Sequence, residues 1–267
     1  MTEKFKHKLK YSIDLGIDFL YRNVNDYGNI YGETNLKSHS FAMCVMSKNI
    51  IDKEKFDFCF KNVAASTYMK GNTFFVLDEN GKISSLLTTM ASLLCMYSNN
   101  VFWAEKYLNF IFSQKEEDGF ISGYEYDKEH IGYSSIIFTK MYEKTKNKKW
   151  IEFSKDILKW IISNGTKNYI DVMAVNCIRK HIQELSFDEY VKNITKTNMG
   201  IDIISSCWWK FDYNMVENLS YEYISTQQDG SNPITAGGFF DSSGNIDIEL
   251  TAKKTDILSE ILKLYND

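Results

Sequence analysis

Two stretches of this sequence share one pattern: residues 114–144 read QKEEDGFISGYEYDKEHIGYSSIIFTKMYEK, and residues 227–261 read QQDGSNPITAGGFFDSSGNIDIELTAKKTDILSEI. Each begins with Gln and reaches an Asp-Gly pair, at Asp118 and Asp229. A glycine, an aromatic pair and an Asp follow, and then a stretch with helical periodicity. The chain is therefore built from repeats, and shorter copies of the pattern occupy 74–90 (FFVLDENGKISSLLTTM) and, more loosely, 25–43 (NDYGNIYGETNLKSHSFAM).

The spacing of these turns indicates the size of the repeat. Asp26, Gly71 and Asp118 follow one another at intervals of about 45 residues, a period that suits a unit of two helices. One helix hairpin cannot bury both of its apolar faces, so neighbouring hairpins must stack. We therefore predict repeated helix hairpins, with room for two less regular ones before Asp229. We expect the aromatic-Asp-x-x-Gly stretches to form tight two-strand turns on one rim.

The composition agrees with long helices. Hydrophobic residues make up 44% of the 267 residues, enough for the core of one domain, and Pro233 is the only proline. Because proline is excluded from helix interiors, its rarity favours helices with few irregular connections. We expect one all-α domain over residues 1–267. Helical periodicity predicts helices over 3–24, 84–97, 101–115, 133–146, 148–163, 168–183, 186–196, 203–227 and 250–265, one that Ser38 N-caps, and one from about residue 50 to Gly71.

Charge and cysteine content exclude several classes of protein. The net charge of −4 offers no clustered basic face, so we expect no nucleic-acid partner. The N-terminus lacks the apolar stretch of a signal peptide, and no run of about 18 apolar residues predicts a membrane span. The five cysteines, odd in number and never spaced as CxxC, predict reduced thiols and a cytoplasmic protein: Cys44, Cys59, Cys95, Cys177 and Cys207.

The loop pattern resembles that of a known superfamily. Long and short loops alternate, an Asp-Gly pair follows an outer helix, and GGFFDSSGN at 237–245 precedes an inner helix. These features resemble the α/α toroids, which include six-hairpin glycosidases, uronyl hydrolases, sugar epimerases and terpenoid cyclases. The resemblance covers most of the chain at the level of architecture. It implies an (α/α)5–6 toroid of helix hairpins with short β-turn loops on one rim; an open solenoid is the alternative.

Carboxylates near the inner-helix starts are the candidate catalytic groups. The resemblance implies that these starts surround a central cavity, where helix dipoles favour polar ligands. Glycoside chemistry needs two carboxyl groups, one to donate a proton and one to activate water or attack. Asp241, Asp247 and Glu249 precede or begin the last inner helix, and we expect them to face Asp118. The alternative is structural, because Asp caps turns and helix dipoles favour acids at helix starts.

The candidate substrate-binding residues come from the same loops. His39 and His130 lie near predicted inner-helix starts, where each could exchange a proton or bind a sugar hydroxyl. Tyr124 and Tyr133 flank His130 and form an aromatic cluster suited to the face of a sugar, and Glu33 lies in the first long loop. The alternative for both histidines is a half-exposed position on the rim.

Missing motifs narrow the chemistry. The sequence has no HExxH, no Cys-His set at zinc spacing, no GxSxG and no Walker loop. Zinc-dependent toroids of the lanthionine-cyclase and prenyltransferase kinds are therefore excluded, and we expect neither a metal nor another cofactor.

Three functional hypotheses remain. The first is a glycoside or unsaturated-uronyl hydrolase that acts on a small molecule or an oligosaccharide. The second is a non-catalytic toroid that binds a glycan, a peptide or a protein partner, and the third is a lyase, epimerase or cyclase for a small natural product. A deep cavity with two carboxylates would favour an enzyme. The sequence indicates neither the substrate nor the oligomeric state.

Overall fold

A computed structural model of the chain describes residues 3–31, 35–119, 121–122, 129–164, 168–179, 181–182 and 213–266. The described part holds ten helices and is mostly helical. None of these helices is long and apolar enough to cross a membrane. The chain divides into two compact units, Met1–Ala65 with Gly200–Asp267 and Ser66–Met199. A single domain over 1–267 stays a prediction.

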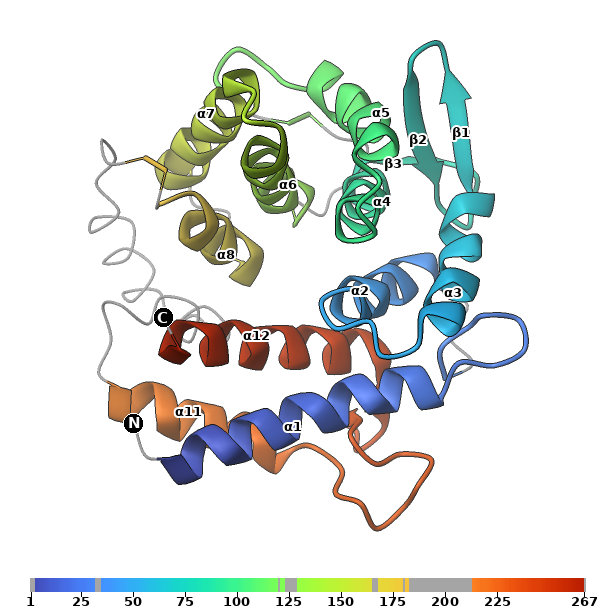
Figure 1. Cartoon of the computed structure of the whole chain (residues 1–267), viewed down its shortest axis with the longest axis vertical. Coiled ribbons are helices and arrows are strands. Elements are labelled where there is room, and N and C mark those ends of the chain that lie inside the picture. The colour runs from blue at the N-terminus through green and yellow to red at the C-terminus, as the bar shows by residue number, and fades with distance from the viewer. Residues whose placement is uncertain are drawn as a thin grey trace. The chain divides into compact units, whose positions relative to one another are not determined.

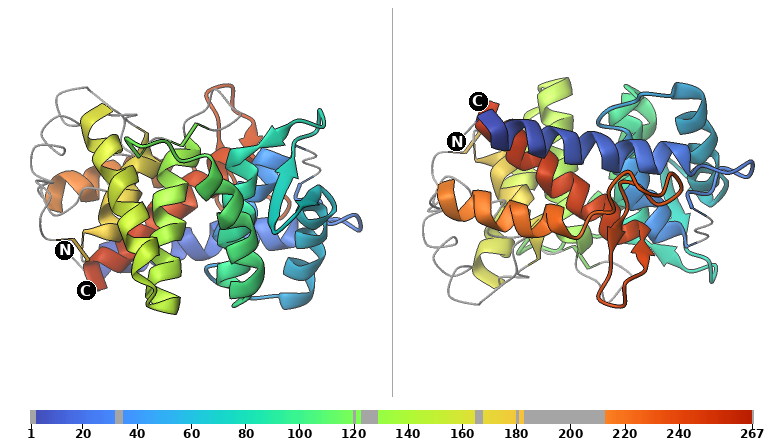
Figure 2. Two further views of the ribbon diagram at one scale, coloured as in Figure 1. Left: turned by 90° about the horizontal axis from the view of Figure 1, so that it is seen from above. Right: turned by 90° about the horizontal axis from the view of Figure 1, so that it is seen from below.

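The first unit packs long helices against one another. α12 lies against α1 on one side and α2 on the other, and α11 packs on α1 (Figures 1 and 2). An antiparallel pair of short strands leads directly into α12. The elements are α1 (Glu3–Arg22), α2 (Leu36–Met46), α3 (Lys53–Ala65), α11 (Tyr213–Ser225), β4 (Phe239–Phe240), β5 (Ile246–Asp247) and α12 (Ile248–Asn266).

The second unit combines a small sheet with helices. The antiparallel sheet has the order β1-β2-β3, and β2 packs on α4 and α5. α6 contacts α4, α7 and α8 (Figure 1). The elements are β1 (Thr67–Lys70), β2 (Thr73–Leu77), β3 (Ile83–Ser84), α4 (Ser85–Tyr97), α5 (Val101–Ser113), α6 (Glu129–Thr145), α7 (Lys148–Asn164) and α8 (Tyr169–Ile178).

Two kinds of helix alternate along the chain. In α3 only Phe56, Cys59 and Val63 are buried, and their spacing of three and four places them on one stripe. In α2, by contrast, ten of eleven residues are buried, and in α4 eleven of thirteen. A helix buried all round lies inside its fold, so α2, α4, α6 and α8 are inner helices and α1, α3, α5 and α7 are outer ones.

Connection lengths alternate in the same rhythm. The predicted alternation of long and short loops holds in part, because the connection that follows the outer helix α7 has only four residues, 165–168. Three connections that follow an inner helix are short: 47–52, 98–100 and 146–147. The connections that follow α1, α3, α5 and α11 are long: 23–35, 66–84, 114–128 and 226–247.

Four of these long connections contain the same turn. The residue before each turn forms a β-bridge with an isoleucine that ends the motif, and a glycine with φ between 73° and 92° stands two positions before that isoleucine. Positive φ explains the glycine, because a side chain is strained there. The turns are NDYGNI (25–30), DENGKI (78–83), EEDGFI (116–121) and DSSGNI (241–246).

Hydrogen bonds define the first residue of this turn. The side-chain oxygens of Asn25, Asp78 and Asp241 each accept from the backbone N–H groups two and four residues ahead, at 2.8–3.0 Å. The structural repeat therefore aligns Asn25, rather than Asp26, with Asp78 and Asp241. In the same register, Glu116 replaces Asp118.

Several predicted helix boundaries are wrong. The helix expected to end at Gly71 ends at Ala65, because residues 67–70 pair with β2 and Gly71 lies in the hairpin turn. Asn35, not Ser38, caps α2: its side chain accepts from the N–H groups of residues 37 and 38. α6 begins four residues before the predicted start at 133. The helix predicted over 186–196 lies outside the described residues.

Candidate functional site

Asp241, Asp247 and Glu249, the predicted catalytic acids of the first unit, lie just before or at the start of α12. Asp247 precedes α12 and accepts a 2.6 Å hydrogen bond from the N–H of Leu250, so it caps the helix. Asp241 is held in its turn by two backbone N–H groups. For these two acids the hydrogen bonds match the structural alternative that the sequence left open.

Glu249 has a different environment. Its carboxylate lies 2.7 Å from the ammonium group of Lys253 and 4.0 Å from that of Lys37, which comes from the start of α2. The hydroxyl of Ser38 lies 3.4 Å from its other oxygen. The side chain remains 25% exposed. The first turn of α12 therefore brings together the carboxyl group of Glu249, two lysine ammonium groups and a hydroxyl.

Both predicted histidines are buried, not half-exposed. His39 is 2% exposed, and its Nε2 lies 3.1 Å from the backbone carbonyl of Cys59 on α3. His130 is 1% exposed, and its Nε2 lies 2.9 Å from the carbonyl of Ile121. Each ring ties the first turns of an inner helix to a carbonyl outside that helix.

A buried acid that the sequence reading missed lies at the start of α8. Asp171 is fully buried. Its own N–H donates a 2.9 Å hydrogen bond to the side chain of Asn168, the N-cap of the helix. Among the described residues, no hydrogen bond of good geometry reaches either oxygen of its carboxyl group. Burial, with the charge of Glu129 acting in the same direction, raises the pKa of Asp171 to about 8. The backbone N–H of Asn168 acts in the opposite direction.

The neighbour of Asp171 is the start of α6. One oxygen of Asp171 lies 2.9 Å from the point where a Cβ on Gly132 would stand. Glu129 lies three positions before Gly132, and residues three apart share a face of a helix. Glu129 is itself buried, at 9% exposure. Two buried carboxyl groups therefore lie in the first turns of α6 and α8, and the charge of Glu129 raises the pKa of Asp171.

One signal in the sequence points to Asp171. The helix YIDVMAVNCI at 169–178 has a single charged residue, and charged side chains are rarely buried unless they have a partner or a role. The Asn168-x-x-Asp171 spacing is also typical of an ordinary helix cap, so the sequence alone does not distinguish a capping role from another role for Asp171.

The other predicted site residues are more scattered. Tyr133 is buried in α6, one turn after Glu129. Asp118 lies exposed in the turn before α6, in the second unit, so its approach to Asp241, Asp247 and Glu249 stays a prediction. Glu33 and Tyr124 lie outside the described residues. Within the described ranges, no three His, Cys, Asp or Glu side chains gather as metal ligands.

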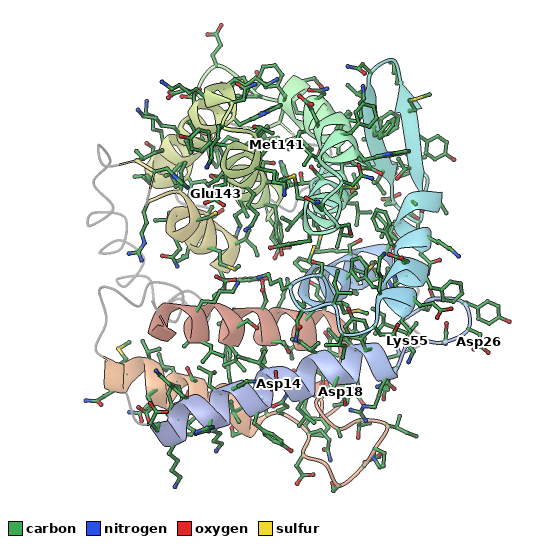
Figure 3. The ribbon with its side chains drawn as sticks, viewed as in Figure 1. Asp14, Asp18, Asp26, Lys55, Met141 and Glu143 are labelled. Atoms are coloured by element: carbon green, nitrogen blue, oxygen red, sulfur yellow. The ribbon has the colours of Figure 1, made fainter. Side chains whose placement is uncertain are left out.

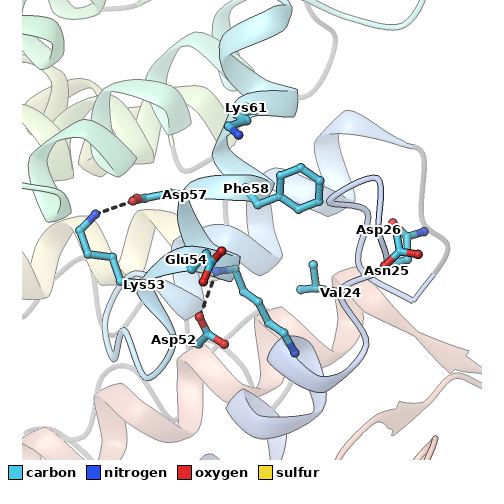
Figure 4. Close-up of a pocket in the computed structure, with 10 residues that line it drawn as sticks. Val24, Asn25, Asp26, Asp52, Lys53, Glu54, Asp57, Phe58 and Lys61 are labelled. Atoms are coloured by element: carbon cyan, nitrogen blue, oxygen red, sulfur yellow. Dashed lines mark hydrogen bonds and ion pairs between the residues drawn. The ribbon is translucent and has the colours of Figure 1, made fainter.

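A cavity of about 920 Å³ lies on the first unit between α3 and the loop after α1 (Figure 4). Asp26 and Lys55 belong to this region (Figure 3). Several of its charges are already engaged: Lys53 pairs with Asp57 at 2.5 Å, and Asp52 accepts from the N–H of Lys55 at 3.0 Å. An outer helix lines this cavity, and none of the predicted site residues does. It is therefore a weaker candidate than the inner-helix starts.

Comparisons with solved structures identify the fold. A structure described as a novel alpha-amylase from Clostridium perfringens covers 94% of this chain and 97% of its own, with a TM-score of 0.62 and 14% identity. A D-mannose isomerase covers 98% of both chains, with a TM-score of 0.68 and 10% identity. The GH76 α-mannanase of Bacteroides thetaiotaomicron covers 98% of this chain and 97% of its own, with a TM-score of 0.59 and 10% identity.

These neighbours are all α/α toroids, and the chain has that fold. The predicted fold class and the predicted resemblance are therefore confirmed. No protein-family model and no curated protein matches the sequence.

Proposed function

We propose that this chain is a carbohydrate-active enzyme whose reaction takes place where its inner helices begin. The observation that carries the proposal is that, in each unit taken by itself, carboxyl groups lie in the first turns of such helices. Glu249 lies in the first turn of α12, and Glu129 and Asp171 lie in the first turns of α6 and α8. The three solved neighbours, which match over nearly the whole chain, support a sugar substrate because their names describe an amylase, a mannose isomerase and a mannanase.

Hydrolysis of a glycosidic or unsaturated-uronyl bond is the reaction that we favour. It needs one carboxyl group that donates a proton to the leaving oxygen and one carboxylate that attacks or activates water. Of the four acids predicted from the sequence, Glu249 suits the attacking or water-activating role best, because two lysine ammonium groups lie beside its carboxyl group. Asp241 and Asp247 are less suited, since backbone N–H groups already bind one carboxylate oxygen of each.

Sugar isomerisation is a second candidate. The D-mannose isomerase matches 98% of the chain with a TM-score of 0.68, so the same architecture carries that chemistry elsewhere. Isomerisation moves a proton between neighbouring carbons, and it too needs a positioned acid and base. The two reactions differ in product, because only hydrolysis creates a new reducing end.

A product assay on the purified chain tests the proposal. D-mannose, α-mannan, a starch-type glucan and an unsaturated uronide are incubated separately with the protein, and ketose and new reducing ends are measured. We expect turnover of at least one of them, and a loss of about 10²–10⁴-fold in kcat for Glu249→Gln. Asp14→Asn is the matched control, because Asp14 lies exposed on the outer helix α1 (Figure 3) and pairs only with Lys10.

The outcomes separate the hypotheses. Ketose without new reducing ends would favour the isomerase. A wild-type protein that binds a sugar, shown by a rise in melting temperature, yet turns none over would support a non-catalytic binding toroid and would reject the enzyme.

A further inference from the structure

α8 carries a buried carboxyl group among apolar side chains. Asp171 is the only Asp, Glu, Lys, Arg or His among the ten residues of α8. Six other residues of this helix, all apolar or aromatic, are buried as well. An isolated buried carboxylate is strongly unfavourable in an apolar environment, so such groups keep their proton or find a partner. Apolar or amide side chains would fill this space at lower cost in free energy.

Helix capping does not account for the carboxyl group. In a capping box, the acid three positions after the N-cap accepts a hydrogen bond from the N-cap's backbone N–H. Here the first half exists, since the Asn168 side chain accepts from the N–H of Asp171 at 2.9 Å. Among the described residues, the return bond to the Asp171 carboxyl group does not reach hydrogen-bond geometry.

The carboxyl group faces the start of α6. Gly132 has no side chain, and this absence makes room for an oxygen of Asp171 at 2.9 Å from its ideal Cβ position. Glu129 is on the same face of α6, one turn closer to the helix start. Two neighbouring carboxyl groups in such a dry space do not both ionise readily, and the charge of Glu129 adds to burial in raising the pKa of Asp171.

We propose that Glu129 and Asp171 share a proton and deliver it to the sugar, with Glu129 as the catalytic acid that touches the substrate and Asp171 as the positioning residue behind it. This inference rests on the function proposed above. Glu129 is the outer member of the pair, since it retains 9% exposure while Asp171 retains none. The shared proton remains bound at neutral pH, in agreement with the raised pKa of Asp171.

The proton balance of the reaction is simple. Glu129 gives its proton to the glycosidic oxygen as the bond from that oxygen to the sugar carbon breaks, and the bonding electrons leave with the oxygen. Water adds its hydroxyl to the sugar carbon, and its remaining proton returns to the pair. No redox partner is needed, and the products are an alcohol, on the leaving oxygen, and a hemiacetal, which is the new reducing end.

Two readouts test the inference independently. Infrared difference spectra between the wild type and Asp171→Asn at pH 7 report the carbonyl stretch of a protonated carboxylic acid, whether or not a substrate is known. We expect this band in the wild type, and we expect Asp171→Asn to remove it. Asp14→Asn is the control and leaves the band intact, because Asp14 is exposed and paired with Lys10.

The second readout is the pH dependence of kcat on the sugar found above. Glu129→Gln is expected to lose about 10²–10⁴-fold in kcat. Asp171→Asn is expected to keep KM and to move the basic limb of the profile to lower pH. The reason is that Glu129 alone loses its proton more readily than the pair does.

Each result has one meaning. A missing band in a folded wild type overturns the shared proton. A band with unchanged kcat and pH profile in Asp171→Asn overturns the catalytic role and leaves the sugar activity in place. If the wild type turns over no sugar, the proposed function fails and proton delivery fails with it, while the band alone decides whether the pair holds a proton. Should Asp171→Asn not fold, Glu129→Gln in the same two assays decides the question.

Discussion

An oxygen of Asp171 on α8 lies 2.9 Å from the position that a Cβ on Gly132 of α6 would occupy. Ile170 lies equally near, with one side-chain carbon at 2.8 Å from that position. The two inner helices therefore meet at a point where only glycine fits. The contact links the packing of the second unit to the candidate acid pair.

Replacement of Gly132 by alanine is expected to destabilise the protein by about 1–3 kcal/mol, as overpacking of a filled core does. The added methyl group would displace either Asp171 or the backbone of Ile170. Chemical denaturation measures the loss. Gly230→Ala is the control, because nothing lies within 4 Å of its Cβ position. Equal stability of both variants would contradict the close contact.

Asp171→Asn is expected to change how stability depends on pH. The folded protein keeps the Asp171 proton up to a pKa of about 8, whereas the unfolded chain loses it near the ordinary aspartate pKa of 3.8. Between these values the unfolded state binds fewer protons, so stability falls as pH rises, by at most about 1.4 kcal/mol per pH unit. The variant lacks this loss. Its melting temperature relative to the wild type should rise from pH 4 to pH 8, whereas Asp14→Asn should show no such trend.

Lys48→Met is expected to destabilise the first unit by about 2–3 kcal/mol at pH 7, below the range for a fully buried pair because Glu260 is partly exposed. Lys48 pairs with Asp256 and lies 3.0 Å from Glu260. Burial would raise the pKa of Glu260, but the charges of Lys48 and Lys263 lower it to about 2.

The same variant has a pH signature. Because the folded pKa of Glu260 is depressed from 4.5, its stabilising effect is present above that value and is lost as pH falls towards 2. Between pH 7 and pH 2, the melting temperature of Lys48→Met should therefore fall less than that of the wild type. Parallel acid profiles would exclude the ion pair as the cause.

Two variants of Asp241 distinguish a structural role in the turn from a catalytic role. Its side chain accepts from two backbone N–H groups, so Asp241→Ala is expected to lose about 1–3 kcal/mol because those donors lose their acceptor. Asp241→Asn keeps an acceptor oxygen and should retain both stability and sugar turnover. If Asp241→Asn were stable but inactive, Asp241 would be a catalytic residue after all.

Much of the architecture could be predicted from the sequence, because a repeated sequence pattern indicates that similar helix hairpins pack on one another. The turns, the rhythm of loop lengths and the nearly proline-free composition all follow from stacked hairpins. Residues 67–70 were misassigned because Thr-Tyr-Met-Lys continues a helical pattern, while its pairing with 73–76 depends on a turn at Gly71. Such pairing has no local signature.

The candidate site was harder to predict for a different reason. Asp247 and Asp171 both stand near helix starts, and the sequence cannot distinguish an acid that caps a helix from one enclosed between two helices. Burial of Asp171 depends on Gly132, a residue almost forty positions away in the chain, and only the packing of α6 on α8 brings them together.

The four turns with one register have a consequence for how such a protein diversifies. Each turn closes through its own hydrogen bonds and its own isoleucine, so the strand pairing at one hairpin does not depend on the sequence of the next. Segments beyond a turn can lengthen or shorten while the register at its base is kept. During evolution, one loop can thus be replaced at a time while the arrangement of the helices stays unchanged.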